Sequence, residues 1–462
     1  MLKDQFLIKM TDIVGDNFVV TDLERLSTVA VDETPNLKPS LPDAWVRPAN
    51  EAQVAQVMAL AYEHGVPVTP RGAGSGQSGG CVPLHGGIVL GLDRLNQIDQ
   101  IDTENMIAKA QPGVILESFQ KEVEGHGLFY PPDPASLQWC TLGGNVAENA
   151  GGPRALKYGV TKDYCLGLRV VLPHGEIIET GKQTVKGVAG YDLTSLMCGS
   201  EGTLGVITNI TFKLIPNTPA VQTAIVVFGS AQDAAQGVAE VFKNGVIPRT
   251  LEYLDRDSIQ AVANHGAPYT FPALAAAALI VETDGTSDEE ALNHLLRALD
   301  AMNKAAPLDT LLAKDERQRR DIWQTRRLLS EATRKIKKRK ISEDVVVPRS
   351  KIPEMVAEIG RIGEANGLGT CAFGHAGDGN LHVQVLFDEE SEMPQVLKSI
   401  DEIFAATLKM GGTITGEHGV GIAKQKYLAW EQSPKVLSLQ REIKKVFDPK
   451  LLLNPGKFIP TL

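Results

Sequence analysis

The stretch Pro70-Arg71-Gly72-Ala73-Gly74-Ser75-Gly76-Gln77-Ser78-Gly79 decides the fold of this 462-residue chain. Its last six residues fit the G-x-G-x-x-G dinucleotide pattern, which in a Rossmann fold runs straight into a helix that holds the pyrophosphate. Here Pro83 and an apolar strand at residues 87–92 follow the loop, and proline with glycine opposes a helix at this place. We therefore exclude a Rossmann NAD site and expect a loop between two strands.

The glycines of this loop still suit an anion. Successive glycines let backbone N–H groups converge on a phosphate, and Arg71 and Ser75 add side-chain donors. A flexible surface loop is the competing interpretation. The flanking sequence predicts an α/β region, with an amphipathic helix at about residues 51–64 and a strand at residues 67–70.

Length, charge and cysteine usage limit the function. A chain of this length exceeds the size at which one core stops growing, so two or more domains are expected. The net charge of −10 argues against nucleic-acid binding, which needs a basic face. Five scattered cysteines without a C-x-x-C pair are typical of a reduced, cytoplasmic protein without disulfides or its own iron–sulfur cluster.

No signal for export or membrane insertion is visible. Residues 1–5 lack a basic start followed by an apolar core. The longest apolar run, residues 271–281, is too short to span a bilayer. We expect a cytoplasmic protein, associated with the inner face of the membrane only through a partner.

Composition divides the chain into four segments. We expect a helical, proline-containing leader at residues 1–44, a glycine-rich region of two α/β subdomains at 45–216, a cap at 217–410, and a C-terminal segment at 411–462. In the cap, strands are expected near residues 226–228, 249–254 and 276–282, with helices capped by Ser230 and Ser287, and a charged helical stretch at about 314–340. The β-α-β, β-α-β order predicts an α+β, ferredoxin-like cap.

A histidine pair flanks a turn signal in the cap. Residues 374–379 read Gly-His-Ala-Gly-Asp-Gly, and Asp378-Gly379 is a strong signal for a two-residue hairpin turn. Such a turn would set His375 opposite His382, and opposed side chains on one face lie close enough to bind one metal ion. The alternation of Leu381, Val383 and Val385 with polar residues predicts one apolar face. A hairpin with merely satisfied polar histidines is the competing interpretation.

Several motifs, in order, resemble the vanillyl-alcohol oxidase / p-cresol methylhydroxylase superfamily of flavoproteins. They are the loop at residues 70–75 and the segments at 131–136, 141–145, 148–152, 157–159 and 199–207. The resemblance implies FAD held across the two subdomains, and it is non-covalent because the loop has Ser75 where some members carry a histidine. The implied FAD-binding residues are Pro70, Arg71, Gly72, Ala73, Gly74, Ser75, Gly76, Pro132, Asp133, Thr141, Gly143, Gly144, Asn145, Asn149, Gly152, Tyr158, Gly159, Glu201, Val206, Ile207 and Asn454.

A glycine-flanked Glu417-His418 pair completes a His₂Glu set with His375 and His382. Three protein ligands with an open position are typical of a catalytic divalent site. The set resembles the D-2-hydroxyacid dehydrogenase branch of the superfamily, which implies that His375, His382 and Glu417 bind Zn, Mn, Fe or Co and that His418 is the base. A divalent ion would acidify the substrate hydroxyl, and a neutral imidazole accepts its proton.

Residues 323–330 resemble the branch's substrate-carboxylate segment. The resemblance implies that Arg326 and Ser330, expected one helical turn apart, bind the carboxylate, and an arginine fork suits that group. A solvated helix face is the competing interpretation. Asn380 beside the hairpin is a further candidate for contact with the substrate. Where the 2-hydroxyglutarate branch has a lysine this chain has Ser342, which favours a small acid such as D-lactate or glycolate.

The predicted activity is FAD-dependent, metal-assisted oxidation of a small D-2-hydroxy acid. The alternatives are a D-2-hydroxyglutarate dehydrogenase, a non-catalytic flavin subunit of a larger complex, and a flavin reductase or alkyl-transfer enzyme. The sequence leaves four electron acceptors open: an electron-transfer flavoprotein, an iron–sulfur subunit, a quinone and a cytochrome. It also leaves open whether the protein is a homodimer. The basic run at residues 334–340 is interpreted as a solvated helix end rather than a docking site for an acidic partner.

Overall fold

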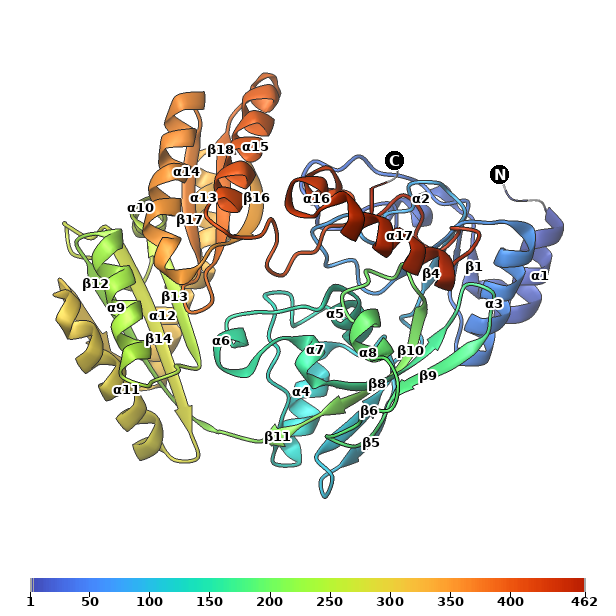
Figure 1. Ribbon diagram of the computed structural model, residues 1–462, viewed down its shortest axis with the longest axis horizontal. Helices are drawn as coiled ribbons and strands as arrows, with labels where there is room; N and C mark the ends of the chain where they lie inside the picture. Colours follow the sequence, from blue (N-terminus) through green and yellow to red (C-terminus); the bar gives the residue numbers. More distant parts are fainter. Residues whose placement is uncertain (1, 3, 461–462) are drawn as a thin grey trace. The chain divides into compact units, whose positions relative to one another are not determined.

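The computed structural model describes Leu2 and residues 4–460, and these residues form two compact units (Figure 1). The first unit contains Met1–Gly151, Val160–Asn217 and Glu417–Leu462. The second unit contains Gly152–Gly159 and Thr218–Gly416. Each unit is built on its own β-sheets.

Two main sheets form the framework of the first unit. A four-stranded sheet has the order β1-β2-β4-β3, in which β2, β4 and β3 are parallel and β1 is antiparallel. A five-stranded antiparallel sheet has the order β5-β6-β10-β8-β9. The strands are β1 (Val19–Val20), β2 (Ala44–Val46), β3 (Val68–Arg71), β4 (Ile88–Gly91), β5 (Ile98–Asp102), β6 (Ile107–Ala110), β8 (Cys165–Val171), β9 (Ile177–Gly181) and β10 (Val206–Lys213), with the small pair β7 (Leu128–Phe129) and β11 (Ile215–Pro216).

Within the expected leader at 1–44, Leu2 and residues 4–44 contribute to the core of the first unit and are more than a helical leader. Helix α1 (Asp4–Val14) buries Phe6, Met10 and Val14 in a cluster with α3 (Glu51–His64), and Figure 1 shows the two helices side by side. The segment also supplies β1, which pairs with β2. Composition did not indicate this strand because it is only two residues long.

The glycine-rich loop connects two parallel strands, as predicted. β3 ends at Arg71, β4 begins at Ile88, and no helix lies between them. The exclusion of a Rossmann loop is therefore confirmed. The remaining helices of this unit are α2 (Leu23–Ser27), α4 (Leu116–Gly125), α5 (Leu142–Glu148), α7 (Thr161–Tyr164), α8 (Leu193–Met197), α16 (Gln425–Glu431) and α17 (Pro434–Phe447).

A seven-stranded sheet forms the second unit, with the order β15-β12-β14-β13-β17-β18-β16 and antiparallel neighbours throughout. Its first four strands, with α9 and α11 as connections, have the 4-1-3-2 order of a ferredoxin-like fold, which confirms the predicted cap. The strands are β12 (Ala220–Phe228), β13 (Thr250–Asp255), β14 (Ala277–Gly285), β15 (Asp309–Leu312), β16 (Arg339–Val346), β17 (Gly369–His375) and β18 (Asn380–Phe387).

Helices cover both faces of this sheet. α9 and α11 lie against one face, where Gly237 of α9 approaches Phe228 and the Thr283 hydroxyl bonds the carbonyl of Ala291 in α11. The opposite face carries a core made with α10, α12 and α13, including Leu254 and Ile322. The helices of this unit are α6 (Ala155–Tyr158), α9 (Ala231–Lys243), α10 (Arg256–Asn264), α11 (Asp288–Met302), α12 (Glu316–Arg327), α13 (Leu329–Ile336), α14 (Ile352–Asn366) and α15 (Met393–Lys409).

The predicted two-residue turn at Asp378-Gly379 is wrong. His375 pairs with Asn380 and Phe373 with His382, so the loop spans the four residues 376–379. The N–H groups of Asp378 and Gly379 both donate to the carbonyl of His375, at 3.2 and 3.0 Å. The register has moved by two residues from the predicted one, and this keeps both histidines on one face of the sheet.

The predicted charged helix at 314–340 is broken into three elements. α12 ends at Arg327, α13 ends at Ile336, and residues 339–340 already belong to β16. The basic residues 337–339 form ion pairs with the acidic residues 388–390 that follow β18. The antiparallel pairing of β16 with β18 brings these two charged runs together at the surface, and Arg334 and Lys335 of the same basic run lie exposed in the last turn of α13. Within the described residues, no helix has both the length and the apolar character needed to cross a membrane.

Candidate active site

A pocket of about 1300 Å³, part of it open to solvent, lies in the first unit. Three glycine-rich segments line it, at residues 70–76, 141–145 and 201–207. Glu417 and His418 also line this pocket. Loops at strand and helix ends therefore present backbone N–H groups to one cavity, which suits an extended, phosphate-bearing group.

Two thirds of the residues implied for FAD binding line this pocket. They are Pro70, Arg71, Gly72, Ala73, Gly74, Ser75, Gly76, Thr141, Gly143, Gly144, Asn145, Glu201, Val206 and Ile207. The structure does not place the following residues in the lining: Pro132, Asp133, Asn149, Gly152, Tyr158, Gly159 and Asn454.

The residues outside the lining have structural contacts instead. Asn454 is buried and donates from Nδ2 to the carbonyls of Gly80 and Glu201, at 2.9 and 2.8 Å, so it braces two of the pocket loops. Asn149 ends α5 and accepts a hydrogen bond from the N–H of Lys162. Gly152, Tyr158 and Gly159 belong to the second unit, where the Tyr158 hydroxyl donates to Asp284 at 2.6 Å.

Several glycines of the pocket are required by contacts within the protein. A Cβ at residue 72 would lie 2.4 Å from the hydroxyl oxygen of Thr141, and one at residue 143 would lie 2.5 Å from Cβ of Pro112. Arg71 is buried and donates to the carbonyl of Val31 at 2.8 Å and to Cys81 Sγ at 3.0 Å. Arg71 therefore holds the loop in place, and the first loop packs tightly on the second.

Buried polar atoms without a protein partner face the same cavity. Asp32 Oδ2, Asn145 Nδ2 and Glu148 Oε2 form no hydrogen bond within the described residues, and all three residues line the pocket. Buried polar groups are normally paired, so these atoms indicate a bound polar molecule. The glycine cradle and these atoms together fit FAD.

The floor of the pocket is acidic. Burial raises the pKa of Glu201 to about 7, although the N–H groups of Val420 and Gly421 bond its carboxylate and act in the opposite direction. Burial and the neighbouring charge of Glu201 raise the pKa of Glu148 well above its ordinary value. Burial without a cationic partner in hydrogen-bond contact thus favours the protonated form of Glu148.

The histidine pair lies in the second unit, at the end of β17 and the start of β18. The rings of His375 and His382 are 5.3 Å apart between centroids and nearly perpendicular, and they carry ring nitrogens within 4.8 Å of each other. His375 is buried, while His382 is partly exposed. The pair has the geometry of two ligands to one ion, and imidazole nitrogens bind Zn²⁺ at about 2.0–2.1 Å.

A buried glutamate, Glu252 on β13, lies directly opposite His375. Its Oε1 is 2.5 Å from Nδ1 of His375, and its Oε2 accepts from Nε of Arg326 at 2.9 Å. Burial alone would raise the pKa of this carboxyl, but the charges of His375 and Arg326 outweigh burial and lower it. Metal-binding histidines usually donate their other ring nitrogen to such a carboxylate.

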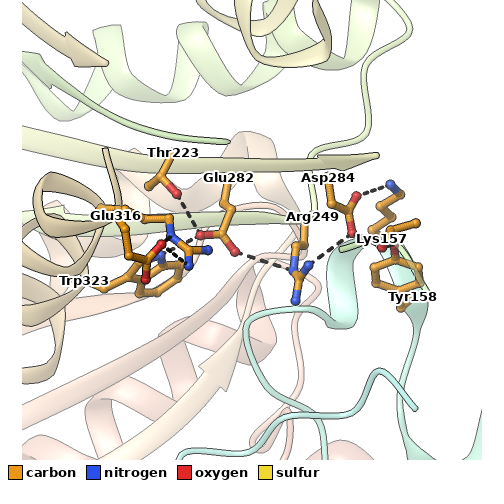
Figure 2. A network of polar contacts seen from close by, with 10 residues as sticks. Lys157, Tyr158, Thr223, Arg249, Glu282, Asp284, Glu316 and Trp323 are labelled. Atoms are coloured by element: carbon orange, nitrogen blue, oxygen red, sulfur yellow. Dashed lines mark hydrogen bonds and ion pairs between the residues drawn. The ribbon is translucent and has the colours of Figure 1, made fainter. Parts of the chain in front are cut away.

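A polar network on the neighbouring strand holds helix α12, which carries Arg326 (Figure 2). Glu282 accepts from Nε1 of Trp323 at 2.6 Å and from the Thr223 hydroxyl at 2.8 Å. Arg249 lies between Glu282 and Asp284, at 3.5 Å from each carboxylate. Two acids on adjacent strands, Glu252 and Glu282, thus anchor the predicted substrate-carboxylate segment.

The other predicted substrate residues have separate surroundings. Ser330 is exposed and accepts a hydrogen bond from Nζ of Lys340 at 3.0 Å. It belongs to α13 and Arg326 to α12, and Leu328, which has helical backbone angles, joins the two helices. Asn380 is buried opposite His375, and its Oδ1 has no hydrogen-bond partner within the described part of the chain. That free acceptor suits a hydroxyl group of a bound molecule.

Sequence reasoning missed Glu252 and Asp32. Glu252 is the single charged residue in the run Thr250-Leu251-Glu252-Tyr253-Leu254. An acid inside an apolar strand needs a buried partner, so this pattern could have indicated a functional residue. Asp32 belongs to residues 1–44, which were interpreted as a leader.

Comparison with known proteins identifies both halves of the chain. A family model described as "FAD binding domain" matches residues 42–181, and one described as "FAD linked oxidases, C-terminal domain" matches residues 218–458. The glycolate oxidase subunit GlcD of Bacillus subtilis is 41% identical over 445 residues, covering 96% of this chain and 94% of the relative. The D-lactate dehydrogenase of Anaerostipes hadrus is 37% identical over 90% of this chain and 89% of its own. The D-2-hydroxyglutarate dehydrogenase of Stutzerimonas stutzeri is 31% identical over 97% of each chain.

The fold is shared with solved flavoproteins. p-Cresol methylhydroxylase with bound substrate aligns with a TM-score of 0.82 at 18% identity, covering 99% of this chain and 96% of that one. At this identity the likeness shows the fold alone. It confirms the two-subdomain FAD-binding fold with an α+β cap.

Proposed function

The chain belongs to the family of FAD-linked oxidases, and on that premise we propose that it oxidises a small D-2-hydroxy acid, D-lactate or glycolate, with the help of a divalent metal. Oxidation of a hydroxy acid is the activity that the relatives share by name, and the two matching family models describe FAD-linked domains. The metal, the choice of acid and the electron acceptor are our proposals. One observation supports the proposed metal site: His375 and His382 are adjacent, and the buried Glu252 contacts Nδ1 of His375.

Glu417 is the proposed third ligand. It directly follows Gly416, whose N–H donates to Asp344 at 2.7 Å. Asp344 lies on β16 opposite His382, and the side chains of opposed residues share one face. The Cα atom of Glu417 therefore stays about 3.8 Å from that of an anchored residue of the second unit. Two histidines and one glutamate form a common catalytic zinc-type donor set.

Bound FAD supplies a hydride acceptor, and a bound divalent ion supplies Lewis acidity toward an α-hydroxyl group. Arg326 binds the substrate carboxylate through its terminal nitrogens, since its Nε is already bonded to Glu252. Asn380 accepts a hydrogen bond from the substrate hydroxyl through its free Oδ1. His418, which lines the flavin pocket, takes up the hydroxyl proton at a ring nitrogen as C2 is oxidised.

Ser342 supports a substrate with one carboxylate. It lies on β16 opposite Gln384, and its hydroxyl accepts a hydrogen bond from Nε2 of Gln384 at 2.6 Å. A second, distal carboxylate would find no cation at this position. D-2-hydroxyglutarate is therefore the second candidate substrate, favoured by the relative of that name rather than by these residues.

We propose a protein or quinone as the electron acceptor, but not through the basic run at residues 334–340. Three of its cations, Lys337, Lys338 and Arg339, already form ion pairs within the protein. An acidic partner would have to displace these intramolecular carboxylates. Docking at this surface is thus disfavoured.

Anaerobic bleaching of the bound flavin tests the proposal. The protein is mixed with D-lactate, glycolate, L-lactate or D-2-hydroxyglutarate, with and without a chelator. We expect bleaching by D-lactate or glycolate that the chelator and His382→Ala abolish, whereas His294→Ala on helix α11 has no effect. An oxidised spectrum with all four acids would sink the dehydrogenase proposal, and bleaching that is indifferent to the chelator and to His382→Ala would remove the metal from it.

A further inference from the structure

Glu252 joins two groups that the proposed mechanism uses separately. One carboxylate oxygen is 2.5 Å from Nδ1 of His375, and the other accepts from Nε of Arg326 at 2.9 Å. The side chain of Glu252 has no exposed surface. Both of its oxygens are thus engaged, one by a predicted metal ligand and one by the predicted substrate-carboxylate arginine.

The contact with His375 decides which ring nitrogen binds a metal. An ionised carboxylate only accepts hydrogen bonds, so Nδ1 of His375 is the donor. When the ring is in the neutral form that binds a metal, its lone pair is then on Nε2. Such a carboxylate also fixes the orientation of the ring and raises its basicity as a ligand.

The contact between Glu252 and Arg326 determines which edge of the guanidinium can bind a substrate carboxylate. The carbon centre of the guanidinium lies 4.7 Å above the ring of Phe373, a residue that pairs with His382. Nε is bound to Glu252, and the two terminal nitrogens form no hydrogen bond with any described residue. The free edge is the one that binds a carboxylate with two parallel hydrogen bonds.

We propose that Glu252 is a positioning residue that couples the metal ligand His375 to Arg326, so that metal binding and hydroxy-acid binding strengthen each other. The inference rests on the proposed function and adds a residue that neither touches the substrate nor binds the metal. Coupling of this kind is reciprocal, because each ligand raises the affinity of the other by the same factor. Loss of Glu252 frees the His375 ring and the Arg326 side chain together.

The neighbouring strand offers a matched control, Glu282. It is also buried, faces the same side of the sheet, and holds the same helix α12 through Trp323 at 2.6 Å (Figure 2). Its partners among the described residues, Thr223, Arg249 and Trp323, include no predicted metal ligand. Glu252→Gln and Glu282→Gln therefore both remove a buried charge beneath α12, and only the first removes the proposed coupling.

Titration with Co²⁺ provides a readout that is independent of turnover. The FAD-loaded, metal-free protein is titrated with Co²⁺ by visible absorption and calorimetry, with and without pyruvate, the unreactive 2-oxo product of lactate. In the wild type we expect pyruvate to tighten Co²⁺ binding. In Glu252→Gln we expect Co²⁺ affinity to fall about 10- to 100-fold, as for other residues behind metal ligands, with loss of the pyruvate effect. At saturating Co²⁺ the KM for the hydroxy acid stays raised in this variant, and Glu282→Gln binds Co²⁺ within threefold of the wild type.

Arg326→Met keeps the inference testable if Glu252→Gln does not fold, as judged by FAD content and Tm. Arg326 binds no metal, yet its loss should weaken Co²⁺ binding severalfold by releasing Glu252. If Glu252→Gln binds Co²⁺ as tightly as the wild type, the coupling inference is overturned while the proposed function stands. If Glu252→Gln does not fold, the same result in Arg326→Met has the same consequence. If the wild type binds no Co²⁺, or binds Co²⁺ at a site that His382→Ala does not weaken, the proposed metal function is refuted and this inference with it.

Discussion

Replacing Gly379 with alanine should damage the second unit much more than replacing Gly367. Both glycines have positive φ, +90° and +70°, so both substitutions impose the same left-handed backbone on an alanine. The space around them differs. A Cβ at residue 379 would lie 2.0 Å from the backbone carbonyl oxygen of Val347, whereas a Cβ at residue 367 meets nothing within 4 Å.

The magnitude follows from these two contributions. A left-handed alanine costs about 1–2 kcal/mol, and this applies to both variants. Forcing a methyl group into packed backbone adds about 1–3 kcal/mol at residue 379 alone. Gly379→Ala should therefore lose about 2–5 kcal/mol of unfolding free energy and Gly367→Ala about 1–2 kcal/mol. The loop of residue 379 follows His375 directly, so the steric shift also reaches the histidine pair.

Thermal unfolding and Co²⁺ titration check this prediction. Trp323, the tryptophan of the second unit, provides the fluorescence signal. For a domain of 150–250 residues 1 kcal/mol shifts Tm by about 2–4 °C, so the two variants should differ by at least about 2 °C. Gly379→Ala should bind Co²⁺ more weakly, and Gly367→Ala should bind it normally. Equal Tm values with equal Co²⁺ affinity would falsify the steric reasoning.

Two further predictions concern buried polar groups. Burial raises the pKa of Asp255, which caps helix α10, to about 7, so the free energy of unfolding of the wild type falls as pH rises from about 4 to 7. In urea denaturation, the free energy of unfolding of Asp255→Asn should therefore rise relative to that of the wild type over this pH range, by at most about 4 kcal/mol. A difference between the two proteins that does not change with pH contradicts the prediction. The control Asp192→Asn should show the opposite pH dependence of stability, because the hydrogen bond with Ser195 lowers the pKa of the exposed Asp192 carboxyl. The stabilisation that ionised Asp192 gives the wild type is lost only as pH falls below about 4. Asn145→Ala should weaken FAD binding about tenfold, since Nδ2 of Asn145 has no protein partner within the described residues, and unaltered FAD affinity by fluorescence titration would count against this assignment.

The hairpin shows how far local sequence carries a prediction. A side-chain period of two identified the apolar face correctly, and Leu381, Val383 and Val385 are fully buried. The turn itself was mispredicted because a side-chain contact within the loop and a backbone contact outside the hairpin determine it. The carboxylate of Asp378 accepts from the N–H of Asn380 at 3.1 Å, and the tight packing of residue 379 on Val347 leaves room only for glycine. The histidines nevertheless share one face, since a two-residue shift preserves side-chain direction.

Long-range pairing could not be predicted from the sequence. Local patterns located the strands near Glu252 and His375 but contain no information on which strands are neighbours. The flavin loops were easier to predict, because each is one contiguous glycine-rich motif, and most of the residues in these motifs line the pocket. Asp32 and Glu252 reach their sites through tertiary contacts between distant segments, and for this reason sequence reasoning did not find them.

The topology of the second unit explains why the candidate site lies where it does. After β16 the chain repeats the strand–helix–strand–strand–helix order of its first half, and Thr413 forms a single antiparallel bridge beside β16 in place of a fourth strand. Two ferredoxin-like halves are thus joined at β13 and β17, each of which would otherwise be an edge strand. Pairing removes both edges and brings Glu252 opposite His375.

The register at this junction is determined by charge as well as by apolar packing. A slip of one residue would turn Glu252 to the other face of the sheet, among the apolar side chains beneath α9 and α14. It would also leave a carboxylate buried without His375 and Arg326, which costs far more than a lost hydrogen bond. Since the correct register alone satisfies this acid, the same contact that aligns the two halves also orients the metal ligand. Stability of the junction and geometry of the site are therefore linked through one residue, Glu252.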